Sequence, residues 1–148
     1  VNNNSSSPMM NNVTATATDG NTSYGVNNYE EESSTMMNNV TATGTGGTYV
    51  RGVYNEVSSP IMNNVTATAT GGTASNYGVE NYESSFPTIR NSSITGTGGT
   101  FTNSIINDSE SSAKIANTTL DGDVTGAFTC AAVNDADFYE LNEDCQEN

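Results

Sequence analysis

Apolar and polar positions alternate along several short segments, with the period of two that is typical of a half-buried β-strand. The clearest segment runs from Val13 to Thr18, where Val and Ala alternate with Thr, and similar segments begin at Val40 and Val65. No 3.6-residue spacing is present, and Thr, Val, Gly and Asn predominate where helical repeats use Ala, Leu, Glu and Lys. The pattern therefore predicts an all-β protein.

These segments belong to a longer repeat that predicts the architecture. Each unit opens on an apolar residue, and the opening residues recur every 25 to 27 residues, a period in the range of solenoids. A solenoid needs only a thin apolar core, because each unit buries its face against the next one. This explains how a chain with only 33% hydrophobic residues can fold. The opening residues are Met10, Met37, Met62, Ile89 and Ile115.

Turn-forming residues divide each unit. Asn11-Asn12 allows a bend, Asp19-Gly20 and its equivalents supply a second corner, and Ser pairs near Pro8 and Pro60 supply a third. We therefore expect three short strands per unit. The sequence predicts a right-handed parallel β-helix of about five rungs, with the handedness taken from the general rule for crossover connections.

Two asparagine columns recur at fixed places in the unit. Stacked Asn amides can hydrogen-bond from rung to rung and satisfy one another where the backbone turns. We predict two asparagine ladders and expect the first to turn inward. The Asn-x-Ser/Thr triplets that coincide with it, such as the one at Asn12, are therefore interpreted as incidental and not as glycosylation sites. The first column is Asn12, Asn39, Asn64, Asn91 and Asn117, and the second is Asn28, Asn55, Asn81 and Asn107.

The chain begins in the middle of a repeat. Val1 fits a column that contains Val26, Val53, Val79 and Ile105, and Asn3 fits the second asparagine column. The first rung is therefore predicted to have an open edge, and open edges recruit strands. We expect either a longer parent chain upstream or self-association through this rung.

Residues 9 to 112 resemble the bacterial right-handed parallel β-helix proteins of the pectate-lyase-like superfold that carry NVTATASGGT-type repeats. The segment IMNNVTATATGGTASNYGVENYESSFP, from Ile61 to Pro87, matches that repeat almost position by position. The resemblance implies the fold and a secreted or surface protein. It implies little about activity, because one fold hosts many functions.

The last part of the chain departs from the repeat. After Thr118 the Thr run is lost, and we expect coils over residues 1–126 and a C-terminal cap over residues 127–148. Cys130 and Cys145 suggest a disulfide in an oxidising, extracellular compartment, with two free thiols as the alternative. Related chains end in a similar Cys-containing segment. The larger apolar residues expected to cover the last rung are Leu120, Phe128, Phe138, Tyr139 and Leu141.

Charge excludes some partners. The chain has 17 acidic and three basic residues, no His and a formal net charge of −14. Nucleic acid is not expected as a partner, because phosphate binding needs clustered Lys and Arg. No apolar run is long enough for membrane insertion.

The sequence predicts no enzyme. A polysaccharide lyase needs clustered basic residues, whereas Arg51, Arg90 and Lys114 occupy different columns of the repeat. A glycoside hydrolase needs two carboxylates at a defined separation, and most acidic residues here lie at variable corners. We predict no cofactor. Asp121 and Asp123 form a weak calcium candidate, for which a solvated turn is the favoured interpretation.

Threonines on the outer side of the repeated strand form a candidate binding face. They predict a flat, uncharged grid, and three interpretations remain: β-propensity alone, ice binding, or contact with another subunit, a glycan or a surface. We expect a non-catalytic, extracellular structural or adhesive β-helix that forms a surface fibre or filament. The alternatives are an ice-binding protein and a carbohydrate-binding or lyase-like protein. The grid comprises Thr14, Thr16, Thr18, Thr41, Thr43, Thr45, Thr66, Thr68, Thr70, Ser93, Thr95 and Thr97.

Overall fold

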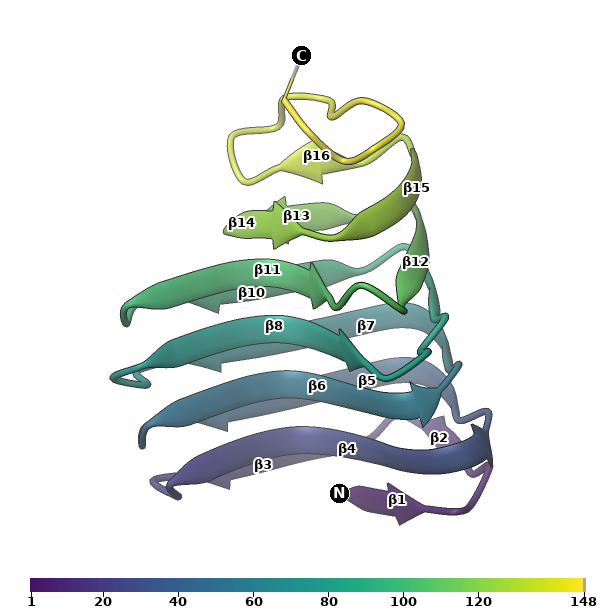
Figure 1. Cartoon of the computed structure of the whole chain (residues 1–148), viewed down its shortest axis with the longest axis vertical. Coiled ribbons are helices and arrows are strands. Elements are labelled where there is room, and N and C mark those ends of the chain that lie inside the picture. Colours follow the sequence, from purple (N-terminus) through teal and green to yellow (C-terminus); the bar gives the residue numbers. More distant parts are fainter. Residues whose placement is uncertain (148) are drawn as a thin grey trace.

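The chain folds into a parallel β-solenoid whose rungs stack along one axis (Figure 1). The structure is a computed structural model that describes residues 1–147, apart from the side chains of residues 30–33. The solenoid has about 4 turns, close to the five rungs expected. The described residues form strands and no helix, so none of them forms a helix that could cross a membrane.

Two parallel sheets enclose the core (Figure 1). The six-stranded sheet contains β1 (Asn2–Asn4), β4 (Thr22–Ser33), β6 (Tyr49–Ser58), β8 (Ser75–Tyr82), β11 (Phe101–Asn107) and β14 (Asp123–Thr125). The ten-stranded sheet contains β2 (Met9–Asn11), β3 (Thr14–Thr18), β5 (Met36–Thr45), β7 (Ile61–Thr70), β9 (Thr88–Arg90), β10 (Ser93–Thr97), β12 (Ser112–Ala116), β13 (Thr119–Asp121), β15 (Ala127–Ala131) and β16 (Asn134–Asp135).

The ten-stranded sheet bends at the first asparagine column. In two rungs the strand continues through the bend, because β5 passes through Asn39 and β7 through Asn64, each with φ of 54°. Asn tolerates this left-handed conformation better than most residues. At Asn12 the same bend separates β2 from β3. The expectation of three separate strands per rung therefore fails for β5 and β7, where two predicted strands are one.

Apolar columns fill the space between the sheets. The opening residues are paired in register and buried, and Cys130 continues their column beside Ile115. A second buried column contains Val26, Val53, Val79 and Ile105. Each of these side chains stabilises the fold by about 1.5 to 3 kcal/mol through removal from water. The repeat frame predicted from the sequence is therefore confirmed.

The second asparagine column forms a buried, continuous ladder. It begins at Asn3, whose Nδ2 donates to the Oδ1 of Asn28 at 2.8 Å. The same bond repeats to Asn55 and Asn81 at 2.8 Å and to Asn107 at 2.7 Å. The last amide donates to a backbone carbonyl in β15. The inner ladder, including the place of Asn3 in it, is confirmed.

The first asparagine column lies outside, which corrects the expectation that it turns inward. Asn39 donates to Asn12 at 3.2 Å and Asn64 donates to Asn39 at 2.6 Å, but all three are exposed. Asn91 donates instead to Asn63. Asn117 shares the positive φ of the column, and its backbone N–H donates to the next rung as those of Asn12 and Asn91 do. A left-handed residue at an outer bend turns its side chain away from the core. Burial is therefore not a reason to set aside the Asn-x-Ser/Thr triplets of this column.

The C-terminal segment is fastened to the last rung by a disulfide. Cys130 and Cys145 are bonded, as predicted, with a Cα–Cα distance of 5.6 Å. Phe128 is buried in the core, and the partly buried Leu141 packs against the core. Phe138 and Tyr139 are 79% and 71% exposed, so they do not cover the rung as expected. Phe138 has a φ of 66° at a tight turn.

Removing this disulfide should destabilise the protein. In the chain-entropy model a loop of about 15 residues is worth about 3 kcal/mol, because the bond restricts the unfolded chain. We expect Cys130→Ala/Cys145→Ala to lower the free energy of unfolding by about that amount in urea titrations. Reduced wild-type protein is the control and should match the double variant. A loss below about 1 kcal/mol in both would contradict the expectation.

Candidate functional site

The predicted threonine grid lies on the outer side of the ten-stranded sheet, and we call it the threonine face. Its rungs come from β3, β5, β7 and β10, which pair in parallel register. The first column runs through Thr14, Thr41, Thr66 and Ser93. The second and third columns are matched in the same way, and they are Thr16, Thr43, Thr68 and Thr95, then Thr18, Thr45, Thr70 and Thr97.

Small inner residues hold the threonine face close to the opposite sheet. The side chains between the threonines point inward, and Ala42, Ala67 and Ala69 are fully buried. Opposite them lies a column of glycines in the six-stranded sheet, and a Cβ built on Gly52 would lie 2.7 Å from the backbone nitrogen of Thr68. The two sheets therefore touch through their backbones here. This close contact makes the threonine face rigid.

The threonine face is uncharged within a strongly acidic chain. Its twelve positions carry only hydroxyl-bearing residues, and they are exposed or half-buried. The first column continues at Thr119, whereas the second ends at Asp121. The regular grid therefore covers four rungs and is bounded by a carboxylate beyond Thr95.

The three basic residues are not brought together. Arg51 lies in the six-stranded sheet, whereas Arg90 and Lys114 lie on β9 and β12 of the ten-stranded sheet. Asp121 and Asp123 belong to different sheets, on either side of Gly122. No group of three or more Cys, Asp or Glu that could hold a metal ion is found among the described residues.

A second candidate site, which the sequence reasoning missed, is the outer side of the six-stranded sheet. We call it the tyrosine face, because six of the seven tyrosines lie on it. Tyr24 and Tyr77 flank Arg51 in register. The signal was a pair of tyrosines five residues apart that recurs in three successive rungs. The six are Tyr24, Tyr29, Tyr49, Tyr54, Tyr77 and Tyr82.

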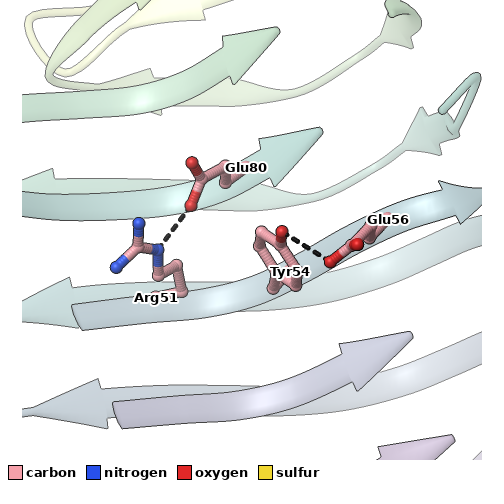
Figure 2. A network of polar contacts seen from close by, with 4 residues as sticks. All are labelled: Arg51, Tyr54, Glu56 and Glu80. Carbon is pink, nitrogen blue, oxygen red and sulfur yellow. Dashed lines mark hydrogen bonds and ion pairs between the residues drawn. The ribbon is translucent and has the colours of Figure 1, made fainter. Parts of the chain in front are cut away.

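Arg51 is held by aromatic rings and a carboxylate. Its Cζ lies 5.9 Å, 5.7 Å and 5.3 Å from the ring centroids of Tyr24, Tyr49 and Tyr77. Its Nε also forms an ion pair with Glu80 (Figure 2). These are the geometries of cation–π contacts and a charge-assisted hydrogen bond. Arg51 is therefore already neutralised and has the position of a structural residue.

A second polar pair lies on the same face. Tyr54 donates from its hydroxyl to Oε2 of Glu56 at 2.8 Å, and Figure 2 shows this pair beside the Arg51–Glu80 pair. The ring centroids of Tyr24 and Tyr54 are 5.2 Å apart. Burial raises the pKa of the Tyr54 hydroxyl, and the bond to Glu56 raises it further. Burial also raises the pKa of Tyr24, with Arg51 opposing the shift. Both tyrosines therefore stay protonated at neutral pH, and Tyr54 acts as a hydrogen-bond donor.

Comparisons with protein-family models, with curated proteins and with solved structures found no significant match to this chain.

Proposed function

We propose that this chain is a non-catalytic, secreted or cell-surface β-solenoid that acts as a rigid structural or adhesive element. The observation that carries the proposal is the threonine face, which is rigid, in register and uncharged on a chain with a net charge of −14. Such a face suits broad lateral contact, because no charged side chain must be desolvated. The disulfide is compatible with an extracellular compartment. The repeat's resemblance to bacterial pectate-lyase-like β-helix proteins supports the same compartment.

The edge of the solenoid formed by β1, β2 and β3 is a second surface that we propose to contact a partner. Among the described residues, β1 pairs only with β4, and β2 and β3 pair only with β5. Their free backbone groups can accept a further rung in parallel register. We propose that this rung comes from another copy, so that rungs continue into a filament.

Ice binding is the second candidate function, and the regularity of the threonine face favours it. Side chains on one face of a strand are about 6.7 Å apart, and neighbouring rungs are about 4.8 Å apart. Three columns over four rungs repeat this spacing without a charged interruption. A regular lattice of hydroxyl and methyl groups is the kind of surface that can order water into an ice-like layer.

One double variant separates these functions. Thr43→Lys/Thr68→Lys places long charged side chains in the middle of the threonine face and should abolish whichever contact it makes. If the face is a subunit contact, electron micrographs and sedimentation will show the assembly dissolved, with freezing behaviour unchanged. If it binds ice, thermal hysteresis and ice shaping will disappear. Folding should survive, since outward-pointing substitutions rarely cost more than about 0.5 kcal/mol.

The matched control is Thr73→Lys/Thr100→Lys. These threonines are exposed on adjacent rungs beside the Gly corner, so the control makes the same charge change outside the threonine face. It should leave assembly and freezing behaviour intact. If neither double variant changes either property, β-propensity alone explains the threonines. Turnover of pectin, alginate or another uronan that is lost in Arg51 or Arg90 variants would contradict the non-catalytic proposal.

A further inference from the structure

Glu56 on the tyrosine face has tyrosines at the same register positions as Arg51 has. Arg51 has one tyrosine in register on the preceding rung, one on the following rung and one two residues earlier on its own strand. Those three rings contact its guanidinium, as described above. The arrangement therefore suits a cation, and the chain itself provides the example.

Three tyrosines occupy the equivalent register positions beside Glu56. Tyr29 is paired with it on the preceding rung and Tyr82 on the following rung. Tyr54 precedes it by two residues on β6 and donates to its Oε2. The difference lies at the centre, where a carboxylate replaces the guanidinium. The register thus places three tyrosines and an anion side by side where no basic residue of the described chain lies, because Arg51 pairs with Glu80 and the other two basic residues are on the opposite sheet.

This part of the tyrosine face is accessible and negative. Tyr29 and Tyr82 are 36% and 41% exposed. A hollow of about 590 Å³ lies beside Tyr82 at the corner of the rung, and Glu83 and Asp108 also line it. The Glu83 carboxylate raises the pKa of the Tyr82 hydroxyl, and Asp108 and Glu56 add to the shift. A positively charged partner would be attracted to such a surface.

We propose that Tyr29, Tyr54 and Tyr82, with Glu56 between them, bind an Arg or Lys side chain of a basic protein segment. The rings supply cation–π contacts and Glu56 supplies the opposite charge. Exposed Tyr with a carboxylate rim is typical of protein interfaces, where Tyr is enriched. A second copy of this chain is disfavoured as the partner at this face, because its three basic residues are scattered and it offers no basic segment. This inference is independent of the threonine face, which lies on the other sheet.

The test uses a short peptide with a single cation. Acetyl-Gly-Arg-Gly-amide is titrated into isotope-labelled protein, and the isosteric citrulline peptide, which is neutral, is titrated in parallel. The Arg peptide should shift the ring signals of Tyr29, Tyr54 and Tyr82, and the citrulline peptide should not. A tetra-arginine peptide then gives affinities by calorimetry. We expect Glu56→Gln to weaken it about five-fold and Tyr29→Leu or Tyr82→Leu about three-fold each.

Glu143→Gln is the matched control, because it removes one exposed carboxylate in the C-terminal segment and gives the same net charge as Glu56→Gln. It should change the affinity less than two-fold. Equal losses in the two Glu variants would overturn the proposal, since general attraction to an acidic chain would explain them. Ring shifts elsewhere, or no binding by the wild-type protein, would overturn it too. If Glu56→Gln does not fold, the two Tyr→Leu variants decide.

Discussion

Replacing Asn55 by Asp should destabilise the protein by about 3 to 5 kcal/mol at neutral pH, the cost of an uncompensated buried charge. Asn55 is fully buried and lies in the middle of the inner ladder. Its Oδ1 accepts from Asn28 and its Nδ2 donates to Asn81, both at 2.8 Å. Aspartate is nearly isosteric but has no amide donor, so a carboxylate oxygen would face the Oδ1 of Asn81. Urea unfolding measures the loss.

The pH dependence of the Asn55→Asp variant provides a further check. Burial raises the pKa of the introduced carboxyl group in the folded protein above the unfolded value of about 3.9. The native state therefore holds the proton more tightly than the unfolded chain. Relative to the wild-type protein, the variant should lose stability as the pH rises from about 4 through the raised pKa, and regain most of it below about pH 4.

The outer ladder provides the matched control. Asn39 also accepts one amide bond and donates another, but it is exposed. Asn39→Asp makes the same chemical and charge change in water, so it should cost less than about 1 kcal/mol. Similar losses in the two variants would mean that ladder bonding, and not burial, determines the stability.

The sequence predicted the solenoid because every rung requires the same kinds of residue at the same positions. Met37 and Met62 must face inward, Asn55 must meet Asn81, and Gly must occupy the tight corners, so the frame was visible at each unit. The direction of the first asparagine column was not predictable in the same way. Inner and outer ladders have the same residue at the same period. They differ in the φ of one residue at a bend, which the positive value at Asn39 reveals.

Of the two candidate sites, one was predictable from the sequence and the other was not. The threonine face was predictable, because the alternation of apolar and polar residues along a strand indicates which side chains point outward. The tyrosine face was not, since its residues vary between rungs: Tyr24, Arg51 and Tyr77 share one column, and Tyr29, Glu56 and Tyr82 share another. Such columns look irregular in an alignment. The parallel register shows that a tyrosine from each neighbouring rung lies beside the charged residue between them.

The two faces have different chemistry on one rigid frame. The threonine face is repeated and uncharged, so its contact area grows with each added rung. The tyrosine face has two distinct centres, one of which is satisfied internally by Glu80. A repeated surface suits a repeated partner such as a lattice or another solenoid, and a unique surface suits a single partner. This contrast supports assigning the proposed structural contact and the proposed basic protein segment to opposite sides.

Gly52→Ala should be almost as damaging as Asn55→Asp, with an expected loss of about 4 kcal/mol in the free energy of unfolding, above the usual cost of overpacking. A Cβ at position 52 would lie 2.6 Å from the carbonyl oxygen of Gly78 and 2.7 Å from the backbone nitrogen of Thr68. Both are backbone atoms of strands, so no side chain can rotate away. The contact with Gly78 lies within the six-stranded sheet and the contact with Thr68 lies between the sheets, so both β8 and β7 would have to move.

Gly71→Ala distinguishes this close contact from the general cost of replacing glycine. Gly71 has a φ of 75°, but its Cβ would come no closer than 3.3 Å to a neighbouring atom, so its variant should lose only about 1 kcal/mol. Urea unfolding of both variants compares them directly. If Gly52→Ala is as mild as Gly71→Ala, the sheets can yield and the threonine face is not rigid. A large difference would mean that backbone contact between the sheets holds the threonine columns in place, because separating β6 from β7 moves Thr68 itself.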